Sequence, residues 1–244
     1  MPAGKLGKLA PKKHKLTLRF EDFRTPVDPN IPPPKRAWEY VIADDKWGMY
    51  GNNVKGDCTL AAKAHIIMCI TANAGALVVP DPAEIVGIYD QLSPDDTGLA
   101  MTDVYDYWLK NPIAGQKLAG WVQIDQTNDQ HFDECVNLFG ACDTGIQLPQ
   151  SAIDEFNAGQ NWEFVNPTGG IAGGHDVPYL GFGRLGKTCI TWSRRQPCGN
   201  AFVQNFCDEA YAPFLESWFD TAGTAPNGFN RDALWNALQA LKAA

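Results

Sequence analysis

The hydrophobic and polar positions of the first half of the chain follow helical patterns. Residues 58–73 (CTLAAKAHIIMCITAN) are helix formers without Pro or Gly, and a glycine that stops a helix lies two residues further on. Two more helices are predicted at 80–92 and 101–112, where Asp81 and Thr102 are residue types that cap a helix N-terminus. The first half is therefore predicted to be mainly helical.

The second half shows short β-type runs bounded by Gly, Pro, Asn and Asp, which is typical of strands. One helix interrupts these runs at residues 129–140. The pattern predicts an α+β protein, with a helical lobe over about 45–110 and a β-rich lobe over about 111–215. The predicted strands lie at 117–125, 141–149, 175–183 and 187–193.

Two segments flank this predicted domain. Residues 1–44 form a basic and proline-rich arm, in which 25–37 carries five prolines and predicts an extended strap over a surface. Residues 216–244 form a C-terminal extension with a predicted helix. Three leucines of this helix fall on one face, namely Leu234, Leu238 and Leu241. An apolar face of this kind favours docking of the helix onto the domain.

Charge is distributed unevenly along the chain, whose net charge is −8. Residues 1–19 hold six Lys or Arg and no acidic residue, which leaves 14 basic against 28 acidic residues elsewhere. A basic arm is thus joined to an acidic body. The arm is expected either to dock on an acidic partner or nucleic acid, or to be a solvated, frayed terminus. Six spread charges make nucleic acid the less favoured partner.

Composition excludes several classes. No run of 18 apolar residues and no signal-peptide pattern occurs, so a protein without a membrane span that is made in the cytoplasm is expected. Seven cysteines without a CxxC pair argue against a zinc ribbon or a thioredoxin-like site, and no metal or cofactor is expected. The cysteines are expected to be reduced, although Cys198 and Cys207 could pair outside a cell.

The segment GNNVKGDCTLAA places Cys58 at the start of a helix, with Asp57 as the expected N-cap. A helix N-terminus and a nearby imidazolium both lower a thiol pKa. His65 lies in the same helix, roughly 10 Å along its axis at the usual rise, which is too far for proton exchange. His175 instead lies at the edge of a β run among glycines, where a substrate backbone can approach. Cys58 and His175 are therefore the predicted catalytic pair.

These features together resemble the papain-like cysteine peptidase superfamily over about residues 45–215. The resemblance implies a two-lobed fold, in which a helical lobe precedes a barrel-like antiparallel sheet and the active site lies between them. Gly56 matches the glycine of the family's nucleophile loop. Asn52 falls where the family has the glutamine that stabilises the oxyanion, and Asn53 is a rival for that role.

The third catalytic position departs from the family pattern. Where an Asn is expected to hold the imidazole, this chain has Thr191, followed by Trp192 in place of the shielding tryptophan. A threonine hydroxyl can accept a hydrogen bond from His175 but orients the ring less firmly. Asp176 is a poor substitute, because a strand neighbour points to the opposite face.

Two other functions stay open at this point. GDCT is close to the GQCT motif of CHAP-type peptidoglycan amidases, so peptidoglycan is a substrate alternative to peptides. The second open function is that of a non-catalytic papain-like scaffold, which is attached to an assembly through residues 1–44. The KLGKL and WGMYGN segments resemble phage-associated proteins, which implies association with a virion as a further location.

Overall fold

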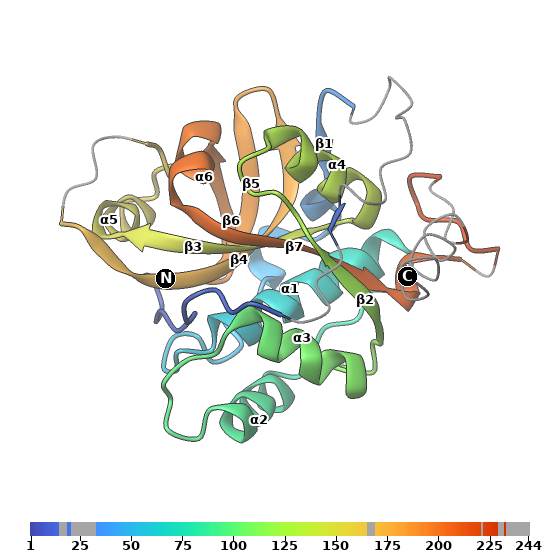
Figure 1. The fold of residues 1–244 in the computed structure, drawn as a ribbon, viewed down its shortest axis with the longest axis horizontal. Helices are drawn as coiled ribbons and strands as arrows, with labels where there is room; N and C mark the ends of the chain where they lie inside the picture. The colour runs from blue at the N-terminus through green and yellow to red at the C-terminus, as the bar shows by residue number, and fades with distance from the viewer. Residues whose placement is uncertain (15–18, 21–32, 165–168, 221, 229–231, 233–244) are drawn as a thin grey trace.

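The computed structural model describes residues 1–14, 19–20, 33–164, 169–220, 222–228 and 232 (Figure 1). These residues form a helical lobe packed beneath an antiparallel sheet, with further helices on the sheet's other side. The α+β class is therefore confirmed. No helix within the described residues is long and apolar enough to cross a membrane.

The helical lobe contains α1 (Cys58–Asn73), α2 (Pro82–Leu92) and α3 (Met101–Lys110), as the pattern predicts. Helix α1 is the central element, because most of its residues are buried and it packs along β4. Asp81 caps α2 by accepting a hydrogen bond from the Ala83 N–H at 2.9 Å. The prediction that Thr102 caps α3 is wrong, since that helix starts after Ala100 without a side-chain cap.

The sheet has the strand order β2-β7-β3-β4-β5-β6, with β1 pairing to β4, and the pairs between its named strands are all antiparallel. The expectation of a barrel-like sheet is wrong, because β2 and β6 do not pair and the sheet stays open. Isolated β-bridges pair with the two edge strands of the sheet instead, from Trp162 to β6 and from Arg19 to β2. The strands are β1 (Arg36–Ala37), β2 (Leu118–Gln123), β3 (Cys142–Pro149), β4 (Ile171–Gly183), β5 (Gly186–Thr191), β6 (Arg194–Gly199) and β7 (Cys207–Leu215).

Three helices lie within the described part of the β-rich half, where the sequence predicts one. Helix α4 (Asp129–Phe139) is the predicted one, and it ends at Gly140, whose φ of +80° suits glycine. Helices α5 (Gln150–Asn157) and α6 (Asn200–Phe206) are additional. Two hydrophobic cores result, one between α1–α3 and the sheet and the other between the sheet and α4–α6.

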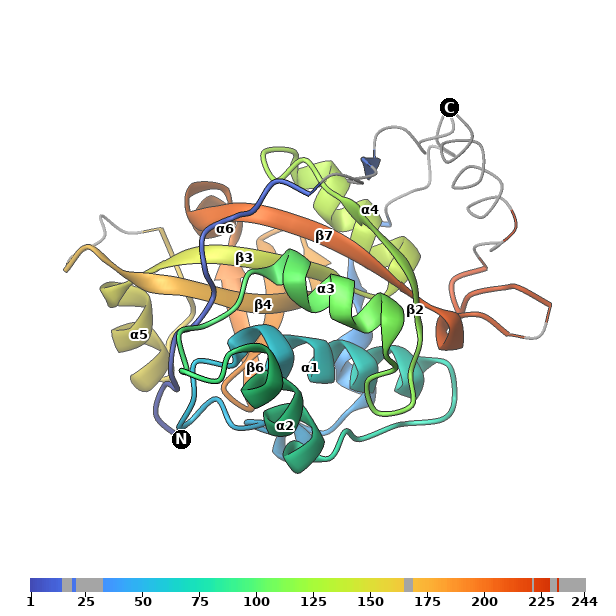
Figure 2. The same cartoon turned by 60° about the horizontal axis from the view of Figure 1, so that its bottom comes forward.

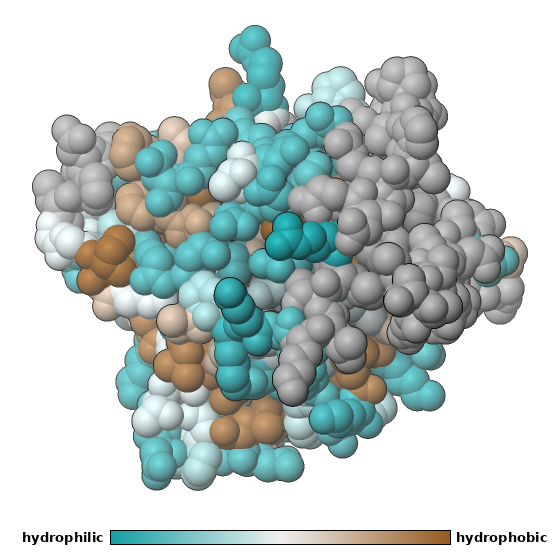
Figure 3. All heavy atoms as spheres, in the orientation of Figure 1, coloured by the Kyte–Doolittle hydropathy of each residue, from teal (hydrophilic) through white to brown (hydrophobic). Residues whose placement is uncertain are grey.

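Three 3-10 turns complete the described elements, η2 (Trp38–Val41), η3 (Asp44–Lys46) and η4 (Glu216–Trp218). The helix predicted at 230–244 lies outside the described residues except for Asp232, as does most of the proline strap. The face drawn in Figure 3 carries brown hydrophobic areas separated by teal hydrophilic ones.

Residues 1–14 lie on the body of the protein. Figure 2 shows this segment running between the helical lobe and the ends of β3 and β4. Backbone hydrogen bonds hold it to both sides: Lys8 N–H donates to Gly174 O at 3.1 Å, and Leu9 N–H donates to Leu99 O at 2.9 Å. We call residues 1–14 the N-terminal segment below.

Candidate active site

A tight loop brings the chain to Cys58. Tyr50 and Gly51 both have positive φ, at +54° and +99°, and a Cβ on residue 51 would lie 2.5 Å from Asp57 Oδ2. Only glycine fits there, because a side chain would meet both strain and a clash. Asp57 occupies the predicted N-cap position of α1, but its side chain makes no capping hydrogen bond. Cys58 is therefore the first residue of the helix, as predicted.

His65, which the sequence excludes as the base, supports this loop instead. Its Nε2 lies 2.8 Å from the carbonyl oxygen of Gly48, and its ring packs edge-on against Trp47 and Tyr50. Burial lowers the pKa of His65 to about 4. The residue is therefore a neutral structural group at neutral pH.

His175 lies on β4, next to the hairpin formed by β5 and β6. Its Nε2 is 2.7 Å from Thr191 Oγ1, the last residue of β5. The indole of Trp192 stacks on the imidazole, with ring centroids 4.6 Å apart and an angle of 25° between planes. Thr191 and Trp192 thus hold the ring from its edge and its face.

The hairpin turn that supplies this support is strained. Thr191 pairs with Arg194, so the turn is Trp192–Ser193, and both residues have positive φ, at +44° and +60°. Two-residue hairpins with positive φ at both positions usually contain Asn or Gly. Here a tryptophan adopts the conformation, and its ring lies on His175. The strained backbone of the turn therefore places the indole of Trp192 where it shields His175.

Four predicted site residues line one small cavity, and they are Asn52, Cys58, His175 and Thr191. The sequence thus identifies residues that come together from the loop, α1, β4 and β5. Asp176 is turned away from the imidazole and bonds to Lys63 instead. This agrees with the expected alternation along a strand.

Asn52 already holds a peptide carbonyl. Its Nδ2 donates to Lys5 O of the N-terminal segment at 3.0 Å and to Lys55 O at 3.1 Å. The side chain is buried, whereas the rival Asn53 is exposed. Of the two asparagines, Asn52 is the one directed toward a bound polypeptide.

The N-terminal segment covers the candidate nucleophile. A Cβ on Gly7 would lie 1.7 Å from Gly56 O, so the segment backbone rests directly on the nucleophile loop. A Cβ on Gly174 would likewise lie 2.1 Å from Lys8 O. The glycines around His175 do admit a close backbone, as predicted, and that backbone belongs to the chain itself. Cys58 is only 1% exposed as a result.

Burial leaves both members of the pair neutral. It raises the pKa of Cys58 to about 12, with the Asp176 charge adding to the rise, although the Asp176 and Gly7 backbone groups hydrogen-bond to the sulfur and oppose it. Burial also lowers the pKa of His175 to about 3. In this covered form Cys58 and His175 line the cavity as a thiol and a neutral imidazole at neutral pH.

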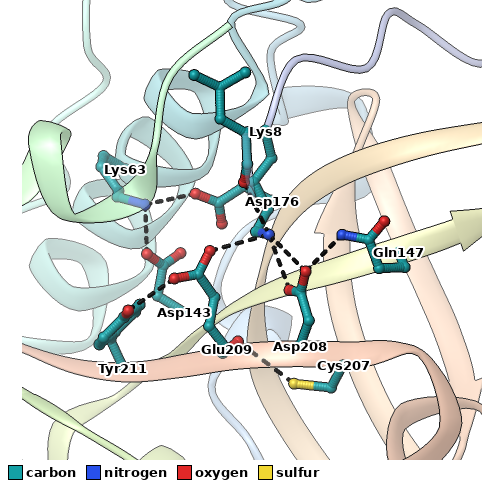
Figure 4. Close-up of polar contacts among 10 residues, drawn as sticks. Lys8, Lys63, Asp143, Gln147, Asp176, Cys207, Asp208, Glu209 and Tyr211 are labelled. Atoms are coloured by element: carbon teal, nitrogen blue, oxygen red, sulfur yellow. Dashed lines mark hydrogen bonds and ion pairs between the residues drawn. The ribbon is translucent and has the colours of Figure 1, made fainter. Parts of the chain in front are cut away.

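A buried ionic network, which the sequence does not predict, lies beside the site. Lys63, on α1, bonds to Asp176 Oδ2 at 2.7 Å and to Asp143 (Figure 4). Tyr105 OH also donates to Asp143. The side chains of Lys63 and both aspartates are fully buried. The signal in the sequence is a lysine in a largely apolar helix, because a buried lysine requires a partner.

All seven cysteines lie within the described residues and are free. The sulfur of Cys198 lies 3.8 Å from that of Cys189, on the neighbouring strand. Cys207 bonds to Glu209 O through its thiol at 3.4 Å. The pairing of Cys198 with Cys207 therefore does not occur in this structure.

Comparison with known proteins defines the fold. No protein-family model matches the sequence, and no curated protein matches it. The structure is similar to xylellain, a cysteine protease from Xylella fastidiosa, with a TM-score of 0.66 and 14% identity over 87% of this chain and 97% of that one. It is also similar to procathepsin B S9 of Trypanosoma congolense, with a TM-score of 0.57 and 12% identity over 87% and 86%.

A third neighbour is procathepsin L 3 from the larval midgut of Tenebrio molitor, with a TM-score of 0.54 and 13% identity over 81% of this chain and 75% of that one. These three neighbours are all papain-like cysteine proteases or their pro-forms. At such identities the likeness concerns the fold, and the fold of this chain is papain-like.

Proposed function

We propose that the protein is a papain-like cysteine peptidase in which Cys58 is the nucleophile and His175 the general base. The observation that supports this most strongly is the shared cavity of Asn52, Cys58, His175 and Thr191. Each residue type in it suits one step of acyl transfer. The peptide held across the cavity, although it is the chain's own, favours a polypeptide substrate over peptidoglycan.

The roles follow from the hydrogen bonds. With the Nε2 proton of His175 donated to Thr191, Nδ1 carries the lone pair, and Nδ1 has no hydrogen-bond partner among the described residues. His175 would take the thiol proton through Nδ1 as the sulfur attacks a peptide carbonyl. Asn52 Nδ2 would then donate to the developing oxyanion, as it now donates to Lys5 O.

The remaining steps complete the cycle. Collapse of the tetrahedral intermediate breaks the C–N bond, and the imidazolium of His175 gives its proton to the leaving amine. Water, activated by the same imidazole, then hydrolyses the thioester and regenerates the thiol. Trp192 would keep the ring oriented and shield its bond to Thr191 throughout.

The N-terminal segment must leave before this chemistry can begin. It presents a backbone N–H of Gly7 to the sulfur, while the Gly7 carbonyl accepts from Leu99 N–H at 2.9 Å. The thiol therefore faces no carbonyl carbon of the segment at this residue. We infer that the described conformation is a closed form of the peptidase, in which the segment is held without being cut.

A variant outside the proposed machinery can open the site. Gly7→Val places a side chain where even a Cβ collides with Gly56 O, so the segment should lift while the body is unchanged. Ala10→Val places the same valine side chain at an exposed position of the segment and serves as the control. Each protein is incubated with an unfolded protein and, separately, with purified cell wall.

The expected result is Cys58-dependent cleavage of the unfolded protein by Gly7→Val, at least tenfold faster than by wild type or Ala10→Val. Adding Cys58→Ala should abolish it. Cleavage of cell wall alone would identify an amidase. If neither substrate is cut although Cys58 has become accessible, the peptidase proposal fails.

A non-catalytic component of a larger assembly is the second candidate. The observations that favour it are the threonine at the third catalytic position and the fully covered Cys58. In that case the N-terminal segment would be a permanent part of the body, and the phage-associated setting implied by the sequence resemblance would apply. Absence of cleavage by Gly7→Val is its expected signature.

A further inference from the structure

The side chain of Lys8 in the N-terminal segment is buried against β3 and β7, and we call the site that it fills the Lys8 pocket. Its side chain is completely buried, and Nζ lies 2.9 Å from Asp208 Oδ1, 3.0 Å from Glu209 Oε1 and 3.2 Å from Leu9 O. Two carboxylates therefore surround one ammonium group (Figure 4). Two other lysines of the segment differ, since Lys5 and Lys12 make exposed ion pairs with Asp96 and Asp103.

The walls of this pocket are held by residues of the body alone. Gln147 Nε2 donates to Asp208 Oδ2 at 2.6 Å, and Tyr211 OH donates to Glu209 Oε2 at 2.7 Å. Both carboxylates are thus oriented by neutral donors on β3 and β7 (Figure 4). These two donors belong to the body, so the orientation of the carboxylates does not depend on Lys8.

The space for the ligand comes from a missing side chain. Gly145 lies in the middle of β3, where glycine weakens a strand unless another group approaches closely. A Cβ at this position would lie 2.1 Å from Lys8 Cε. The pocket is therefore shaped for an unbranched aliphatic chain ending in a cation.

The pocket lies next to the candidate nucleophile. Lys8 directly follows Gly7, whose backbone rests on Gly56 and on the Cys58 sulfur. Around it, Gly174 O, Leu99 N–H and Leu99 O offer main-chain hydrogen bonds that any extended peptide can make. Backbone pairing holds a peptide without regard to sequence, whereas the pocket selects a side chain.

We propose that this pocket is the specificity site of the peptidase and that it selects a lysine side chain within two residues of the bond that is cut. This inference rests on the proposed function. Lys8 is then the resident ligand of the pocket, and the N-terminal segment competes with lysine-containing substrates for it.

The charge arrangement gives the reason for the selection. When Lys8 leaves, Asp208 and Glu209 lose their cation, and the Glu209 side chain is only 2% exposed while a side chain fills the pocket. A neutral side chain in the pocket leaves that charge unpaired, which is costly, whereas an ammonium restores the pair. A site built around buried polar groups rejects ligands that cannot satisfy them much more strongly than an apolar pocket does.

The test measures binding without catalysis, so that it is independent of the proposed chemistry. The full chain carries Gly7→Val and Lys8→Ala to free the pocket and Cys58→Ala to prevent cleavage. The probes are fluorescent peptides of residues 3–12 with lysine, arginine or norleucine at position 8, and their affinity is read by fluorescence anisotropy. Norleucine keeps the aliphatic chain and removes the charge.

The lysine peptide should bind at least tenfold more tightly than the norleucine peptide, and the arginine peptide should fall between them. Adding Asp208→Asn and Glu209→Gln should abolish the preference while norleucine binding is retained, which shows that the body is still folded. Gly145→Ala should weaken lysine binding by filling the pocket.

Equal affinity for the lysine and norleucine peptides would overturn the proposal, as would a lysine preference that survives loss of both carboxylates. A preference for arginine over lysine would contradict the assignment of lysine. A lysine preference in binding, combined with no Cys58-dependent cleavage by Gly7→Val, would retain the pocket as a lysine-binding site and refute the peptidase alone.

Discussion

Thr191 fills the position that an asparagine holds in the family pattern, and its hydroxyl lies 2.7 Å from His175 Nε2. Together with the stacked Trp192, this contact fixes which imidazole nitrogen faces the cavity. The sequence could identify both residues because they follow His175 at a spacing that the family shares. It could not establish that a hydroxyl reaches the ring, because that depends on how β5 registers with β4.

Removing the hydroxyl should impair catalysis more than folding. In the opened Gly7→Val protein, Thr191→Ala should lower kcat/KM by about 10- to 100-fold, since a hydrogen bond to an imidazolium contributes roughly 1.5–3 kcal/mol. Thr191→Asn should restore most of the loss, because its amide oxygen can accept the same proton. Steady-state kinetics check this, and an unchanged kcat/KM for Thr191→Ala would contradict the orienting role.

Alkylation of Cys58 in the closed wild type should depend steeply on pH. Burial raises the pKa of this thiol to about 12, so the thiolate fraction rises about tenfold per pH unit from pH 6 to 9. The rate with iodoacetamide, followed by mass spectrometry of the Cys58 peptide, should therefore climb without a plateau. A plateau near neutral pH in wild type would show that a thiolate already exists in the closed form.

At the scale of elements, the long helices were predictable and the short ones were not. Helix α1 extends over 16 residues without Pro or Gly, so its composition alone predicts a helix. Helices α5 and α6 have eight and seven residues, which are too few to show the hydrophobic period of a helix. Strand β6 has the sequence RRQPCG, which shows no pattern typical of a strand. It is a strand because its backbone pairs with β5, and a local sequence pattern does not predict that pairing.

The β5–β6 turn gives an element-scale prediction. Ser193 has a φ of +60°, a conformation that costs a residue with a Cβ roughly 1 kcal/mol. Ser193→Gly should therefore stabilise the protein by about 1 kcal/mol, measured by urea unfolding. Ser151→Gly, within helix α5, is the matched control and should destabilise by a similar amount. Destabilisation by Ser193→Gly would mean that the turn is not strained.

At the scale of the whole molecule, charge connects the parts. The basic N-terminal segment docks on acidic groups of the same chain, which the sequence could only describe as a basic arm and an acidic body. Contacts such as Lys8 with Asp208 join residues 200 positions apart, so they have no local signature. The meeting of Cys58 and His175 in one cavity was predictable from the motif, whereas the segment that covers Cys58 was not.

Lys63 provides the second connection, between α1 and the sheet. Lys63→Met should lower the free energy of unfolding by roughly 3–5 kcal/mol, because Asp143 and Asp176 are then left buried without their cation. Lys110→Met, at an exposed lysine of α3, should change it by less than about 0.5 kcal/mol. Urea unfolding of both variants checks this, and equal small effects would show that the network does not hold the lobes together.

The most direct test of a peptidase closed by its own N-terminal segment is the alkylation rate of Cys58 at pH 7. Gly7→Val should raise this rate at least tenfold above wild type and Ala10→Val, and above the rates of the other six cysteines. Adding His175→Gln should remove the gain, because the thiolate then loses its imidazolium partner. If Cys58 in Gly7→Val reacts no faster than in wild type, or reacts equally fast without His175, the account is contradicted.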